Sequence, residues 1–194
     1  MGKMEPVVTK VLILVNLAVY VIAGIIGGSF LELNDEILML LGQFNYLVLK
    51  YGWYFQLLTA MFVHVNIVHL AFNMFWLYVL GTQCELTFGI KKYLTIYFAS
   101  GIFGNLLTLY LLPLRTVSAG ASGAVFGIFG SLMAYSGFTR RNMFASVVYA
   151  IFILVLNAGF GVNVVAHFGG LLSGFILGYI YAKKSESTLW RLKV

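Results

Sequence analysis

The sequence predicts an all-α integral membrane protein, a bundle of six transmembrane helices with a membrane-associated first external loop. Of the 194 residues, 61% are hydrophobic and only 9% are charged, whereas soluble domains contain about 25% charged residues. Six apolar stretches approach the roughly 20 residues that cross a bilayer. They cover about residues 8–28, 66–86, 93–112, 122–139, 143–159 and 164–182.

These stretches occupy most of the chain, so residues 1–194 are expected to form a single membrane domain with short connections. The first stretch is longer than the apolar region of a signal peptide and has no small-residue cleavage pattern. This predicts that it remains in the mature protein as a membrane anchor. Cys84 is the single cysteine of this sequence, which excludes an internal disulfide and a cysteine-rich metal site.

Basic residues give the chain its net charge of +6, and six spans place most of them on one side. That side holds Lys3, Lys10, Lys91, Lys92, Arg140, Arg141, Lys183, Lys184, Arg191 and Lys193. The other side holds Lys50 and Arg115, together with the acids Glu32, Asp35 and Glu36. This positive-inside pattern predicts a multi-pass protein of the cell membrane with both termini in the cytosol. It also argues against a nucleic-acid partner.

The longest connection, from about residue 29 to 65, is rich in aromatic residues. It contains Phe30, Phe44, Tyr46, Tyr51, Trp53, Tyr54 and Phe55. Aromatic rings of this kind settle at the membrane interface. We therefore expect a structured external loop that lies partly in the outer leaflet.

Five polar residues stand within or beside the apolar stretches, namely His64, His69, Asn73, Ser122 and His167. Polar and ionisable groups inside a membrane are costly and are usually functional. The alternative for an individual histidine or asparagine is a hydrogen bond that joins two helices.

The depth of these residues follows from the basic residues that mark the cytosolic ends of the spans. Ser122 lies 18 residues before Arg140, or about 27 Å along a helix. His167 lies 16 residues before Lys183, or about 24 Å. Asn73 lies at a similar distance from the cytosolic end of its own span. All three therefore converge in the outer part of a bilayer whose core is about 30 Å thick.

Small residues at every fourth position predict that the fourth and sixth spans pack closely. The fourth span contains Gly123, Gly127 and Ser131, and the sixth contains Gly170, Gly174 and Gly178. Such ridges let helix backbones approach, which would bring Ser122 within hydrogen-bond reach of His167. The alternative is that these glycines are ordinary packing residues.

A serine hydroxyl becomes a nucleophile when an adjacent neutral histidine takes its proton. We assign these roles to Ser122 and His167. Asp35 lies in the first loop, and Glu85 is about 18 Å closer to the cytosol than Asn73. The residues therefore favour a Ser-His dyad over a triad.

Acyl transfer also needs donors that point at the developing oxyanion. Ser122 at the start of a helix offers a free backbone N–H. His69 and Asn73, four residues apart on one helical face, are candidates for side-chain donors.

Along nearly its whole length the chain resembles the rhomboid intramembrane serine proteases. The matching segments are Leu57-Leu58-Thr59-Ala60-Met61-Phe62-Val63-His64, His64-x4-His69-x3-Asn73, Gly120-Ala121-Ser122-Gly123-x3-Gly127 and Ala166-His167-x-Gly169-Gly170-x3-Gly174. The resemblance implies a six-helix rhomboid-type bundle that cleaves transmembrane segments of membrane proteins near their external ends, within lipid and without a cofactor or metal.

The resemblance also implies roles for individual residues. Ser122 would be the nucleophile and His167 the base, with His69 and Asn73 on the oxyanion side. Supporting roles fall to His64, which would hold the loop and helix around it, to Gly120 and Gly123 of the serine motif, and to Phe126, which would stack on the His167 ring.

One position departs from the pattern of many bacterial members. Phe55-Gln56 stands where those members have Trp-Arg. The salt bridge that this arginine would form in the loop is therefore not expected here. Catalysis is not expected to depend on it.

Three other functions compete with proteolysis. A non-catalytic rhomboid-like adaptor would bind transmembrane clients, but such relatives characteristically lack the serine or the histidine. A transporter would also bury polar residues, yet it leaves the Gly-x-Ser-Gly motif unexplained. A metalloprotease is disfavoured because the sequence has no His-Glu-x-x-His motif.

Overall fold

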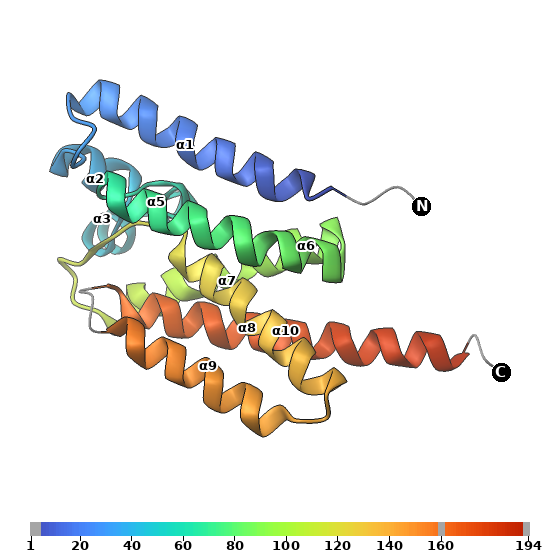
Figure 1. Ribbon diagram of the computed structural model, residues 1–194. Helices are drawn as coiled ribbons and strands as arrows, with labels where there is room; N and C mark the ends of the chain where they lie inside the picture. Colours follow the sequence, from blue (N-terminus) through green and yellow to red (C-terminus); the bar gives the residue numbers. More distant parts are fainter. Residues whose placement is uncertain (1–4, 159–161, 192–194) are drawn as a thin grey trace.

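The structure is a computed structural model that describes residues 5–158 and 162–191, and within these ranges it is almost entirely helical (Figure 1). The predicted end of the fifth span at residue 159, and Lys3 and Lys193 of the basic pattern, lie outside the described residues.

Six long helical stretches coincide with the six predicted ranges to within a few residues, apart from the end of the last. They are α1 (Val7–Gly27), the continuous series α5 (Ile67–Trp76), η2 (Leu77–Gly81) and α6 (Thr82–Phe88), α7 (Ile90–Leu111), α8 (Ser122–Thr139), α9 (Met143–Asn157) and α10 (Val164–Arg191). The last helix continues past the predicted end at residue 182. The segment η2 is a π-helix, a wider turn that is frequent near functional sites.

Among the described residues, four of these stretches are long and apolar enough to cross a membrane: Val7–Gly27, Ile67–Phe88, Ile90–Leu111 and Val164–Glu186. Helix α9 is apolar but has 15 residues, and α8 is rich in glycine and serine. The class of membrane protein built from helices is therefore confirmed, whereas the number of six spans stays a prediction.

Helix α8 is the most enclosed of these helices, because α7, α9 and α10 all pack against it. The two small-residue ridges meet at its contact with α10. A Cβ added to Gly170 would strike the carbonyl of Gly123, and one added to Gly174 would strike that of Gly127. Since the backbones themselves are in contact, α8 needs few bulky apolar side chains to bury its surface.

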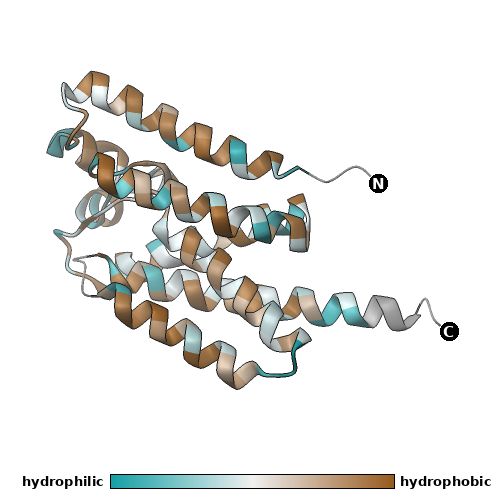
Figure 2. Ribbon diagram, viewed as in Figure 1, coloured by the Kyte–Doolittle hydropathy of each residue, from teal (hydrophilic) through white to brown (hydrophobic). Residues whose placement is uncertain are grey.

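The outward faces of the long helices are apolar, as the brown bands in Figure 2 show. On α1 the side chains of Leu14 and Ile25 are 65% and 67% exposed, and on α9 that of Val155 is 64% exposed. A surface of this kind is stable in lipid rather than in water.

The connection between α1 and α5 is folded, and its position at the outer leaflet stays a prediction. It contains α2 (Asp35–Leu41), β1 (Gln43–Phe44), α3 (Asn45–Tyr51), α4 (Gln56–Thr59) and the short 3-10 helix η1 (Ala60–Phe62). Strand β1 pairs antiparallel with β2 (Val117–Ser118), which precedes α8. Figure 1 shows this connection at the end of the bundle away from both termini.

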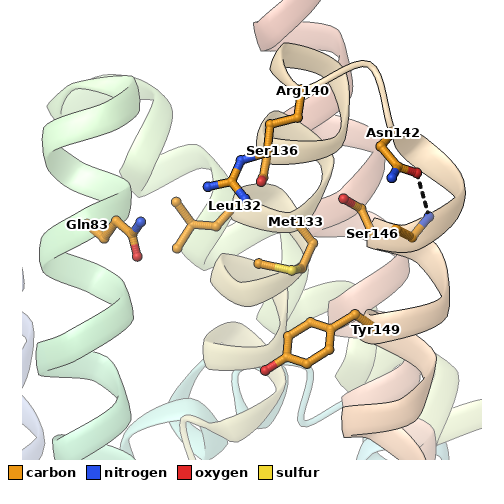
Figure 3. Close-up of a pocket in the computed structure, with 9 residues that line it drawn as sticks. Gln83, Leu132, Met133, Ser136, Arg140, Asn142, Ser146 and Tyr149 are labelled. Carbon is orange, nitrogen blue, oxygen red and sulfur yellow. Dashed lines mark hydrogen bonds between the residues drawn. The ribbon is translucent and has the colours of Figure 1, made fainter.

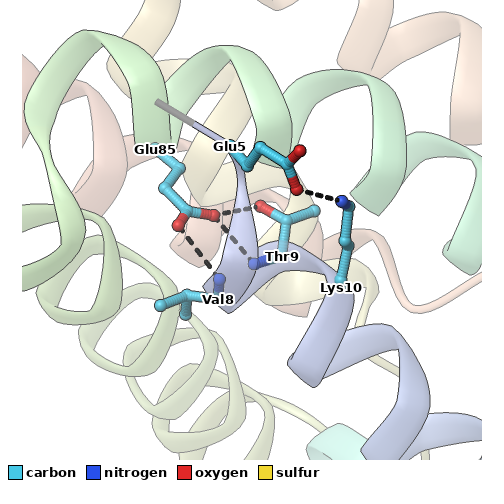
Figure 4. Close-up of polar contacts among 5 residues, drawn as sticks. All are labelled: Glu5, Val8, Thr9, Lys10 and Glu85. Atoms are coloured by element: carbon cyan, nitrogen blue, oxygen red, sulfur yellow. Dashed lines mark hydrogen bonds and ion pairs between the residues drawn. The ribbon is translucent and has the colours of Figure 1, made fainter. Parts of the chain in front are cut away.

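At the opposite end, Glu85 of α6 holds the start of α1 (Figure 4). Its buried carboxylate accepts hydrogen bonds from the backbone N–H groups of Val8 and Thr9, at 3.0 and 2.8 Å, and from the Thr9 hydroxyl at 2.8 Å. These N–H groups have no partner inside their own helix, so Glu85 acts as a cap supplied by another helix. It does not lie beside His167.

Candidate functional site

The centre of the candidate site is the contact between Ser122 and His167. Ser122 is the first residue of α8, and His167 lies in the first turn of α10. The Oγ of Ser122 and the Nε2 of His167 are 2.8 Å apart, which is a hydrogen-bond distance. The two ridges of small residues bring these helix ends together. The short serine side chain can therefore reach the His167 ring.

One face of the His167 ring packs against Phe126, which lies one helical turn after Ser122. The two rings are stacked, with centroids 4.3 Å apart and planes inclined by 20°. His167 is only 3% exposed. Packing therefore fixes the ring orientation in which Nε2 points at the serine hydroxyl.

No carboxylate completes a triad among the residues that the structure describes. The other ring nitrogen of His167, Nδ1, is buried and has no hydrogen-bond partner there. Within the same ranges, no group of three or more His, Cys, Asp or Glu residues could hold a metal ion. Among the described residues, the serine hydroxyl is therefore hydrogen-bonded to a histidine whose other ring nitrogen has no carboxylate partner.

Gly120 brings His69 close to the serine. Its φ of +130° is a conformation that favours glycine. A Cβ at this position would lie 2.7 Å from Cε1 of His69 and 3.7 Å from Oγ of Ser122. The imidazole of His69 therefore occupies the space that a side chain here would need, near the serine hydroxyl.

Asn73 lies one turn below His69 on α5 and is 6% exposed. Its Nδ2 donates a hydrogen bond to the backbone carbonyl of His69 at 2.9 Å. A side-chain amide has two N–H groups, so one remains to donate elsewhere.

His64 supports the loop that leads into α8. It is fully buried, and its Nε2 lies 3.5 Å from the backbone nitrogen of Ala121, a long hydrogen bond. Its ring is 5.2 Å from that of His69. The N–H of Gly120 donates to the carbonyl of Ala60 at 2.8 Å. The residues before the serine are thus anchored to the segment that precedes α5.

Asn163 was not singled out from the sequence, although it directly precedes α10. Its Oδ1 accepts the N–H of Ala166 at 3.0 Å, and its Nδ2 donates to the hydroxyls of Thr108 and Ser118, each at 2.9 Å. The sequence signal for the first contact was an asparagine just before an apolar stretch, which is a helix N-cap pattern. Nothing in the local pattern indicated the other two.

Gln56, at the position of the departure from the family pattern, is fully buried. Its Oε1 accepts the N–H of Phe44 at 3.0 Å, and its Nε2 donates to the carbonyls of Met39 and Leu40 at 2.7 and 3.1 Å. The first connection is therefore held at this point by neutral hydrogen bonds.

Comparison with known proteins agrees with the resemblance read from the motifs. A family model described as the Rhomboid domain matches residues 51–184. Rhomboid protease GluP of Bacillus subtilis strain 168 is 35% identical over 178 residues, which are 88% of this chain and 34% of GluP. For RHOMBOID-like protein 6, mitochondrial, of Arabidopsis thaliana, the identity is 34% over 68% of this chain and 45% of that protein.

A third relative, Rhomboid-like protease 3 of Toxoplasma gondii, is 32% identical over 88% of this chain and 68% of its own length. The chain thus spans about a third of GluP and less than half of the Arabidopsis protein.

Proposed function

The chain belongs to the rhomboid family, and from this premise we propose that it is an intramembrane serine endopeptidase that works with a Ser122-His167 dyad. The observation that carries the proposal is the 2.8 Å distance between Oγ of Ser122 and Nε2 of His167. The relatives named as proteases support the same class of reaction.

In the proposed reaction, Oγ of Ser122 attacks the carbonyl carbon of the scissile peptide bond while Nε2 of His167 takes the hydroxyl proton. The same proton then passes to the leaving amine as the C–N bond breaks, which leaves an acyl ester on Ser122. His167 next takes a proton from a water molecule that attacks this ester. This proton then passes from His167 to Oγ of Ser122 as the ester C–O bond breaks, which releases the new C-terminus and regenerates the serine hydroxyl.

The tetrahedral intermediates carry a negative oxygen that needs donors placed in advance. We assign this role to the backbone N–H of Ser122, to the ring of His69 and to the free N–H of the Asn73 amide. The position of His69 beside Gly120, and the fixing of Asn73 by its bond to the His69 carbonyl, support the assignment.

We propose a single membrane domain in which α8 and α9 also cross, so that six spans place both termini in the cytosol of a multi-pass cell-membrane protein. The connection with α2, α3 and α4 would then lie at the outer leaflet, beside the site. Transmembrane segments of other membrane proteins would be cut near their external ends.

Cleavage dependent on Ser122 distinguishes this function from that of a non-catalytic adaptor, which would bind transmembrane clients without cutting them. The purified full chain is incubated with a membrane protein substrate in detergent or liposomes, and the products are identified by mass spectrometry. Ser122→Ala and His167→Ala each abolish cleavage, because a dyad loses its function when either member is removed.

Ser131→Ala is the matched control on the same helix, since the Ser131 hydroxyl bonds the carbonyl of Ile128 away from the site, and it retains cleavage. Activity of Ser122→Ala within about tenfold of wild type would overturn the nucleophile assignment, because loss of a triad nucleophile costs about 10⁶ in rate. Product ends far from the external end of the substrate span would overturn the proposed topology.

A further inference from the structure

A pocket lies at the far end of α8 from Ser122, between α6, α8 and α9 (Figure 3). Its volume is about 430 Å³, which falls within the roughly 300–1,000 Å³ of small-ligand sites. Its walls are formed by Gln83, Leu132, Met133, Ser136, Arg140, Asn142, Ala145, Ser146 and Tyr149. The proposed catalytic mechanism uses none of them.

The charge of this pocket is positive. Arg140 is the one ionisable wall residue that is charged at neutral pH, and no wall residue is acidic. Its guanidinium forms no ion pair with any residue that the structure describes. Figure 3 shows the side chain turned into the space between α6 and α8. An anionic ligand would therefore balance the charge of this pocket.

Hydrogen-bond donors also line the pocket. Ser136 and Ser146 contribute hydroxyls, and Asn142 contributes a side-chain amide whose Oδ1 already accepts the N–H of Ala145 at 3.1 Å. This leaves the Nδ2 of Asn142 as a donor. The pocket also includes the start of α9, where the helix dipole favours an anion.

The wall nearer the middle of the bundle is apolar, with Leu132 buried and Met133 beside it. Arg140 lies 18 residues from Ser122, or about 27 Å along α8. With α8 crossing the membrane as proposed above, this distance places a charged end of the pocket at one membrane surface and an apolar end within the bilayer. A ligand that fits both ends is amphipathic.

We propose that this pocket binds the phosphate of an anionic phospholipid, with Arg140 as the charged partner and an acyl chain lying toward Leu132 and Met133. A zwitterionic headgroup fits less well, because its cation would meet Arg140 and no carboxylate. The inference does not depend on the proposed proteolysis, since binding is measured without substrate.

The test is a titration of the delipidated full chain in neutral detergent with phosphatidylglycerol, in which native mass spectrometry counts the bound lipid. Phosphatidylcholine and inorganic phosphate are titrated in parallel. Arg140→Gln weakens phosphatidylglycerol binding about tenfold, because it removes one charge-assisted contact. Arg141→Gln is the matched control, since the adjacent arginine is not a wall residue, and it changes the affinity less than about twofold.

Ala145→Leu is a second variant that narrows the pocket and leaves its charge unchanged, and it also weakens binding. Equal losses in the Arg140 and Arg141 variants would overturn the proposal in favour of general surface charge. Equal affinity for phosphatidylcholine would overturn the anionic preference. Inorganic phosphate that binds as tightly as the lipid would show a site for the free anion and overturn the assignment of a lipid.

Discussion

The side-chain amide of Asn163 donates a hydrogen bond to the hydroxyl of Ser118 at 2.9 Å. This contact ties the residue before α10 to strand β2. The chain continues from β2 directly to Ser122, and α10 carries His167 four residues after Asn163. One side chain therefore connects the two segments that supply the proposed nucleophile and base.

Asn163→Ala should lower kcat about tenfold with little change in KM. Each lost hydrogen bond removes about 1 kcal/mol of the interaction energy that holds Ser122 and His167 in position. Asn163→Ser keeps a helix cap but does not reach both hydroxyls, so it should recover stability more than kcat. The measurements are steady-state kinetics and thermal unfolding. An Asn163→Ala protein that is destabilised but has wild-type kcat would show that the residue only caps the helix.

Removal of either proposed oxyanion donor should reduce turnover less than removal of the nucleophile. His69→Ala and Asn73→Ala are expected to lower kcat about 10²–10³-fold, the typical effect of losing one such donor. The comparison is made at saturating substrate, with thermal unfolding of each variant as the control for folding. If both variants turn over at the wild-type rate, the two residues serve packing alone.

Gly170→Ala should separate α8 from α10, because the added methyl group would overlap the carbonyl of Gly123. We expect a loss of about 1–3 kcal/mol in stability together with a large loss of activity. Gly27→Ala is the control on α1, where the nearest atom would be 3.3 Å away, and its effect should be much smaller. Thermal unfolding and cleavage rates are measured side by side. Equal effects of the two substitutions would contradict the close contact of the ridges.

Glu85→Ala should destabilise the fold by about 3 kcal/mol, because it leaves buried N–H groups of Val8 and Thr9 without their charged acceptor. Glu5→Ala removes an acid of an exposed ion pair with Lys10 (Figure 4) and should cost less than about 1 kcal/mol. Unfolding in detergent by denaturant measures both. A Glu85→Ala protein as stable as Glu5→Ala would show that the cap is dispensable.

Substrate helix stability should control the rate of cleavage. Carbonyl groups locked in helical hydrogen bonds are not open to attack, so Gly or Pro near the scissile bond should raise kcat/KM. A series of test substrates with one such residue moved along the span measures this. Rates that do not change across the series would indicate that no local unwinding is required.

The sequence by itself determined where the long helices lie and which residues are candidates for chemistry. Apolar length is a local property, so the ranges of α1 and α8 followed from composition within a residue. Motifs around Ser122 and His167 identified the candidate pair, and the family model agrees with that resemblance. Both kinds of signal are contained within short stretches of chain.

The tertiary structure alone decided which distant groups meet. The ridges of small residues predicted that Ser122 and His167 approach, but only the packed helices give the 2.8 Å distance between their side chains. No local pattern specified that β1 joins β2 across more than 70 residues, because such pairs depend on how the whole chain packs. Glu85 illustrates the limit: the sequence shows an acid in an apolar span, and only the packing of α6 beside α1 makes it a cap, since the unpaired N–H groups that it satisfies belong to a helix 76 residues away.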